Sequence, residues 1–168
     1  MIHVCSLAAL PATVRRVGAS HVLTVMANVD QVERPASVLP ANHLKVQMDD
    51  IVERMDGFVT PSQAHIEQVL GFVRRWDRSA PLVIHCYAGI SRSTASAFAA
   101  VCALNPRRDE FVIARKIREA SPIASPNRLI VSLADGLLGR GGRMLRALDE
   151  MGPGSMNIEG RPFQIDLE

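Results

Sequence analysis

The chain has 168 residues, the usual size of one folded domain, of which 48% are hydrophobic and 21% charged. This composition is typical of a globular protein and excludes a disordered or fibrous chain. The net charge of +2 does not indicate a nucleic-acid partner, and no apolar run approaches the roughly 18 residues that a membrane-spanning helix needs. The first residues lack the charge order of a secretory signal, so we expect a cytoplasmic protein with no membrane partner.

Four short runs rich in β-branched and aliphatic residues are predicted strands, at 2–6, 21–26, 43–48 and 81–86. The last of them, PLVIHC, is apolar without alternation, which is typical of a strand buried on both faces. Helical patterns separate several of these runs. The pattern predicts an α/β fold with a short, mostly parallel central sheet of four or five strands flanked by helices.

A helix is predicted between the third and fourth strands. Thr60 is its expected N-cap, Pro61 its first residue, and Gln63 completes a capping box. Further helical patterns follow the fourth strand, at 92–104, 106–120, 126–139 and 142–151. We therefore expect one domain over residues 1–151, followed by a loosely packed C-terminal tail over 152–168.

The three cysteines and five histidines show no disulfide or metal-binding pattern, because neither C-x-x-C nor H-E-x-x-H occurs. We therefore expect no metal and no other cofactor. Cys5 and Cys102 are interpreted as packing residues. The pattern gives no indication of an oligomeric state.

Cys86 differs from the other cysteines because it ends the buried fourth strand, and Arg92 follows it at the start of an Ala-rich helix. Cys102 and Arg108 have the same spacing, but they lie at a helix end with no glycine between them. A strand, a loop containing Gly89 and a helix N-terminus together form an anion-binding cradle, since backbone N–H groups and the helix dipole converge there. A phosphoryl group fits this cradle, Arg92 can bind two of its oxygens, and the same field favours the nucleophilic thiolate.

Residues 85–93, HCYAGISRS, resemble the H-C-x-A-G-x-S-R-S signature of cysteine-dependent protein phosphatases, and in particular of the compact dual-specificity class. Residues 121–127, SPIASPN, are similar to the family's R-P-x-x-x-P-N segment, with Ser121 in place of the arginine. The resemblance covers residues 1 to about 140. It implies the phosphatase fold, with a phosphate-binding loop between the last strand and a helix.

The resemblance also implies roles for individual residues. Cys86 is the expected nucleophile, His85 holds the loop through a hydrogen bond, and Asn127 caps a helix and braces the loop. Ser93 either caps the helix or helps the sulfur to depart in the second step. The implied phosphate-binding residues are Tyr87, Ala88, Gly89, Ile90, Ser91 and Arg92.

Cleavage of a phosphomonoester also needs an acid that protonates the leaving oxygen, which typically contributes about 10²–10⁴-fold in rate. In the family this acid lies on a loop after the strand that precedes the long helix, here LKVQMDDI. The family's pattern places it at Asp50, while Asp49 and Asp56 stay open as alternatives.

We therefore interpret the chain as a phosphomonoester hydrolase, a protein tyrosine or dual-specificity phosphatase that acts through a phosphocysteine intermediate. Its expected partner is a phosphorylated protein or another phosphomonoester. Nucleotides and inositol phosphates remain alternative substrates, although the absence of lysine between Cys86 and Arg92 weighs against the latter. A non-catalytic phosphate-binding module and a rhodanese-type sulfurtransferase are the alternatives from other classes.

Overall fold

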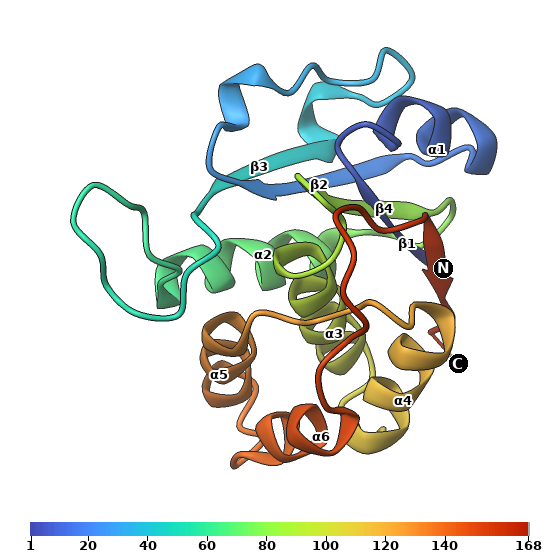
Figure 1. Cartoon of the computed structure of the whole chain (residues 1–168). Helices are drawn as coiled ribbons and strands as arrows, with labels where there is room; N and C mark the ends of the chain where they lie inside the picture. The colour runs from blue at the N-terminus through green and yellow to red at the C-terminus, as the bar shows by residue number, and fades with distance from the viewer. Residues whose placement is uncertain (168) are drawn as a thin grey trace.

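A five-stranded sheet forms the centre of the protein in the computed structural model, which describes residues 1–167 (Figure 1). The strand order is β3-β2-β4-β1-β5, and the first four strands are parallel while β5 runs antiparallel to β1. This confirms the predicted fold class. The strands are β1 (Ile2–Ser6), β2 (His21–Met26), β3 (His43–Gln47), β4 (Leu82–Cys86) and β5 (Phe163–Ile165).

Helices cover both faces of the sheet. One face packs against α1 and the loop that follows β2, and the other carries the remaining five helices (Figure 1). Along β4, Val83 faces the α1 side while Leu82 and Ile84 face the other side, so β4 is buried on both faces as predicted. The helices are α1 (Leu10–Val17), α2 (Gln63–Arg75), α3 (Arg92–Leu104), α4 (Glu110–Ala120), α5 (Arg128–Leu137) and α6 (Arg143–Met151).

The central helix α3 positions the candidate site. It begins at the carboxyl end of β4, and its residues Arg92–Cys102 are all buried between the sheet and the helices α2, α4 and α5. Alanine and serine occupy many of its positions, and such small side chains let the neighbouring elements approach closely. The start of α3 is therefore held rigidly relative to β4.

The predicted start of α2 is wrong by two residues. Thr60 and Pro61 lie in the loop before the helix, and Ser62 is the N-cap. The Ser62 hydroxyl accepts a hydrogen bond from the His65 N–H, and the His65 ring accepts one from the Ser62 N–H. This reciprocal pair satisfies both backbone donors, while the Gln63 side chain donates to Glu67 instead.

The expectation of a loosely packed C-terminal segment is also wrong. Phe163–Ile165 forms β5 on the open edge of β1, with Ile165 opposite Ile2 and buried. A three-residue strand is too short to show a periodic pattern, which is why it was not predicted. The loop after Cys86 thus follows the fourth strand rather than the last, and Glu168 of the predicted tail lies outside the described residues.

Within residues 1–167, no helix combines the length and the apolar character needed to cross a membrane.

A buried ion pair anchors the far end of α3. Arg140 donates to the carboxylate of Glu110 at 2.7 Å and to the carbonyls of Cys102 and Asn105 at the end of α3. Burial alone would raise the pKa of Glu110, but the hydrogen bonds from Arg140 and Arg143 hold it below its usual value. Arg140 therefore neutralises a buried charge and satisfies helix carbonyls at once.

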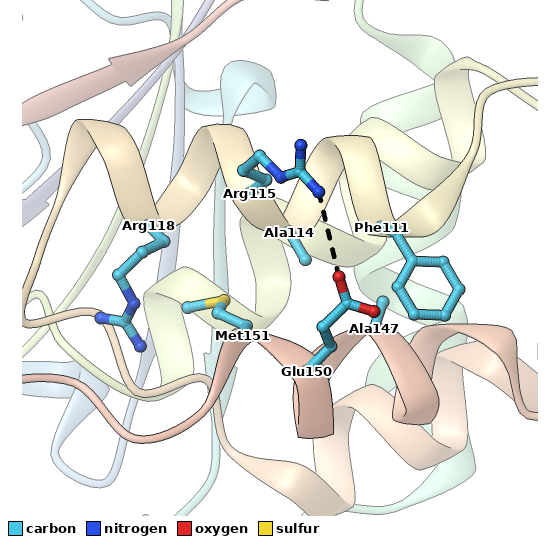
Figure 2. Close-up of a pocket in the computed structure, with 7 residues that line it drawn as sticks. All are labelled: Phe111, Ala114, Arg115, Arg118, Ala147, Glu150 and Met151. Carbon is cyan, nitrogen blue, oxygen red and sulfur yellow. Dashed lines mark ion pairs between the residues drawn. The ribbon is translucent and has the colours of Figure 1, made fainter.

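We predict that Arg140→Ala lowers the free energy of unfolding by about 3 kcal/mol or more, because it leaves the Glu110 carboxylate buried without its main partner. The matched control is Arg115→Ala, which breaks the 3.9 Å ion pair between Arg115 and Glu150 across α4 and α6 (Figure 2). Both of these side chains are more than half exposed, so the control should cost less than about 1 kcal/mol. Urea unfolding measures both losses, and equal losses would contradict the prediction.

Candidate active site

The loop from Tyr87 to Ser91 joins β4 to α3 and curls around the sulfur of Cys86. Its glycine is required, because Gly89 has a φ of 72° and a Cβ there would lie 2.8 Å from the backbone of Cys5 and Ser6. The Gly89 N–H donates to Cys86 Sγ at 3.2 Å. The structure thus bears out the expected close approach of backbone at this position.

Four of the five carbonyl groups of this loop are engaged away from the sulfur. They accept backbone hydrogen bonds from outside the loop: Tyr87 from Leu7, Ala88 from Gly160, Ile90 from Ser125 and Ser91 from Asn127. In a trans peptide the N–H points opposite to the carbonyl of the same peptide group. The N–H groups that follow these carbonyls are therefore directed inward, where they form a concave cluster of donors suited to an anion.

Arg92, the first residue of α3, has its guanidinium fixed beside this cluster. Its Nη1 donates to the carbonyl of Met48 at 3.0 Å, and the residue is only 9% exposed. Its Nε is buried and, among the described residues, makes no hydrogen bond. A buried guanidinium N–H that makes no hydrogen bond is costly, so this donor is suited to a phosphoryl oxygen.

The sulfur of Cys86 receives a second contact from Ser93. The Ser93 hydroxyl lies 3.1 Å from Cys86 Sγ, on the first turn of α3. Within residues 1–167, α3 has Ser91 as its N-cap and shows no side-chain capping bond, so the alternative role of Ser93 as a capping hydroxyl is wrong. Together with the Gly89 N–H, this hydroxyl can stabilise negative charge on the sulfur.

His85 points into the sheet and away from the cradle. Its Nε2 lies 2.7 Å from the hydroxyl of Thr24, which lies 2.9 Å from Nε2 of His43 on the next strand. Burial lowers the pKa of His85 to about 4, so the imidazole is neutral at pH 7. This agrees with a role in holding the loop. Thr24 and His43 were not predicted, because only strand pairing brings them to His85.

Asp50 is the acid candidate that the structure brings to the cradle. Its Oδ1 accepts hydrogen bonds from the hydroxyl of Ser91 and the amide of Asn127, both at 2.8 Å. Its Oδ2 lies 4.0 Å from Arg92 Nε. A cavity of about 580 Å³ opens beside Asp50 and Ser91, between residues 51–55 and the start of α5.

The other two carboxylates lie elsewhere. Asp49 closes the base of the loop that follows β3, because its carboxylate accepts from the N–H of Val59 at 2.7 Å and its own N–H donates to the Val59 carbonyl. Asp56 is exposed in the turn from Met55 to Phe58. The arrangement thus favours Asp50 over both alternatives.

Asn127 caps α5 as expected, while only its backbone N–H reaches the phosphate-binding loop, at the carbonyl of Ser91. Its Oδ1 accepts from the N–H of Ile130, which caps α5, and its Nδ2 donates to Asp50 and to the carbonyl of Ile51. It therefore ties the start of α5 to the acid-bearing segment.

No family model matches the chain, and no curated protein matches its sequence. Solved structures do match. DUSP15 aligns with a TM-score of 0.66 at 18% identity, over 92% of this chain and 94% of that chain. Human DUSP28 aligns with a TM-score of 0.62 at 19% identity, over 83% and 88%.

Two further structures extend this result. The PTP-2 phosphatase of Cydia pomonella aligns with a TM-score of 0.63 at 19% identity, over 80% of this chain and 84% of that chain. The human tyrosine phosphatase-like serine/threonine/tyrosine-interacting protein aligns with a TM-score of 0.61 at 15% identity, over 83% and 92%. Over most of its length the chain therefore has the fold of dual-specificity and tyrosine phosphatases, with Cys86 at the end of β4 and before α3.

Proposed function

We propose that the protein is a cysteine-dependent phosphomonoester hydrolase, and that its substrates are phosphorylated proteins. One observation carries this proposal: the buried Nε of Arg92 makes no hydrogen bond among the described residues, and it lies beside a loop in which four of five carbonyls are engaged away from the sulfur of Cys86. Such an arrangement offers donors to three phosphoryl oxygens and places a nucleophile at their centre.

In the first step, Cys86 Sγ attacks phosphorus, so that an S–P bond forms as the ester P–O bond breaks. Asp50 gives its proton to the departing oxygen. In the second step, water attacks phosphorus while Asp50 takes up a proton from it, and the S–P bond breaks. The Ser93 hydroxyl stabilises the thiolate that leaves, and positioning by the loop and Arg92 lowers the barrier of both steps.

The charges near the cradle support a singly phosphorylated protein substrate over a nucleotide or an inositol polyphosphate. Arg92 is the only basic residue of the segment from Cys86 to Ser93. Arg128, which lines the neighbouring cavity, is already paired with the carboxylate of Asp149. A ligand with several phosphates would need further free cations at this mouth.

A non-catalytic phosphate-binding module is the second candidate, and one observation favours it. A human protein whose name describes it as phosphatase-like and interacting shares this fold. In such a module the cradle would bind a phosphorylated residue without hydrolysing it. Cys86 beside two hydrogen-bond donors supports the catalytic reading instead.

We predict that the protein hydrolyses para-nitrophenyl phosphate in the presence of EDTA and that vanadate inhibits it. Cys86→Ser should lower the rate by at least about 10³-fold, because the chemical step then lacks its nucleophile. Cys102→Ala is the matched control, since Cys102 is buried in α3 and should leave the rate nearly unchanged. A wild-type rate in Cys86→Ser would overturn the assignment, whereas phosphopeptide binding without hydrolysis by the wild type would favour the binding module.

We also predict that Asp50→Ala lowers kcat by about 10²-fold or more for phosphoserine or phenyl esters, whose leaving groups need a proton. The loss should be smaller for para-nitrophenyl phosphate, which expels a stable anion. Asp56→Ala is the control, because Asp56 is exposed in a turn. A loss in Asp56→Ala together with normal turnover in Asp50→Ala would transfer the acid role to Asp56.

A further inference from the structure

The segment after α6 passes beside the phosphate-binding loop on its way to the sheet. We call residues 152–162, which connect α6 to β5, the C-terminal strap. Figure 1 shows it in red, running from α6 past α3 to the strands. Pairing of β5 with β1 anchors its far end, where Ile165 is buried.

Gly160 is the point at which the strap contacts the loop. Its N–H donates to the carbonyl of Ala88 at 2.8 Å, and the residue is buried. A Cβ at this position would lie 2.9 Å from the carbonyl oxygen of Gly89 and 3.3 Å from that of Ala88. The strap and the loop are therefore packed backbone against backbone, with no room for a side chain.

The neighbouring Glu159 adds a second tether. Its carboxylate accepts a hydrogen bond from the hydroxyl of Ser6. Ser6 is fully buried and lies opposite Cys86 in the pairing of β1 with β4. Gly160 thus binds the loop that follows Cys86, and Glu159 binds the residue that pairs with Cys86 in the sheet.

The contact at Ala88 bears directly on the sulfur, because Ala88 and Gly89 share one planar peptide group. The carbonyl of this peptide accepts from Gly160, and its N–H donates to Cys86 Sγ at 3.2 Å. The strap therefore fixes the orientation of a donor that points into the cradle. A chain of two hydrogen bonds through one peptide also polarises both of them.

The strap holds the other side of the cradle as well. Ser155 donates to the carbonyl of Pro122, and the N–H of Gly154 donates to the hydroxyl of Ser125. Ser125 in turn donates its backbone N–H to the carbonyl of Ile90 in the loop. The same segment thus braces the phosphate-binding loop and the loop that supports it.

We propose that the C-terminal strap is a positioning element of the phosphate site, and that Gly160 holds the Ala88–Gly89 peptide so that its N–H faces the sulfur and the bound phosphoryl group. This inference rests on the proposed function. Under this proposal, residues 159 and 160 affect turnover and anion binding in addition to stabilising the sheet.

Gly160→Ala in the full chain tests the proposal, because the added methyl group must displace the loop carbonyls. We expect kcat for para-nitrophenyl phosphate to fall about ten- to a hundredfold, as a misplaced catalytic group does. Vanadate should bind more weakly, and iodoacetamide should alkylate Cys86 more slowly. Gly136→Ala is the matched control, since a Cβ at this position of α5 meets no atom within 4 Å.

Glu159→Ala is the second variant, because its exposed side chain can be removed without a steric conflict. It should lower kcat by about threefold, with a modest fall in melting temperature because the buried Ser6 hydroxyl loses its acceptor. This variant keeps the proposal testable even where Gly160→Ala yields little folded protein.

The outcomes separate the two proposals. Wild-type kcat, vanadate affinity and alkylation rate in both strap variants would overturn the positioning role while leaving the phosphatase intact. A lower melting temperature with an unchanged alkylation rate and kcat would likewise overturn it, because the strap would then contribute only to stability. A wild-type protein that neither hydrolyses the ester nor binds vanadate would instead overturn the proposed function itself.

Discussion

The direction of a few peptide groups around one sulfur atom is the constraint on which the site depends. A loop of five residues presents donors to an anion only when its carbonyls are engaged elsewhere, and here three segments engage four of them: Leu7 after β1, residues 125–127 at the start of α5, and the strap. Loss of any one of these partners would free a peptide to rotate. The cradle is therefore a property of the whole fold, although its sequence is local.

Local features of the sequence predicted the part of the fold that local forces determine. The run at 81–86, the glycine at 89 and the small residues after Arg92 indicated a buried strand, a tight loop and a close-packed helix, and each is present. The parallel sheet was predicted because helical patterns separate the short apolar runs. The preference for Asp50 over Asp49 came from the resemblance alone, and it remains a prediction; in the structure the Asp49 carboxylate accepts a hydrogen bond from the Val59 N–H.

Contacts between segments that are distant in the sequence could not be predicted from local patterns. Thr24 and His43 show no periodic or motif signal, and they approach His85 only because three parallel strands align in register. β5 is too short for a pattern, and its pairing depends on a free edge at β1 that exists only in the folded sheet. The start of α2 moved because His65 can serve as a capping partner, a role that the usual glutamate or glutamine pattern does not include.

The order in which the chain is synthesised gives the strap a consequence for folding. Residues 1–151 contain the nucleophile, the guanidinium and four strands of the sheet, whereas Gly160 and β5 leave the ribosome only afterwards. Because domains fold as their residues emerge, a nascent chain can form most of the core before the peptide at Ala88 is secured. On this arrangement the peptide that faces the sulfur of Cys86 is secured only after β5 has paired with β1.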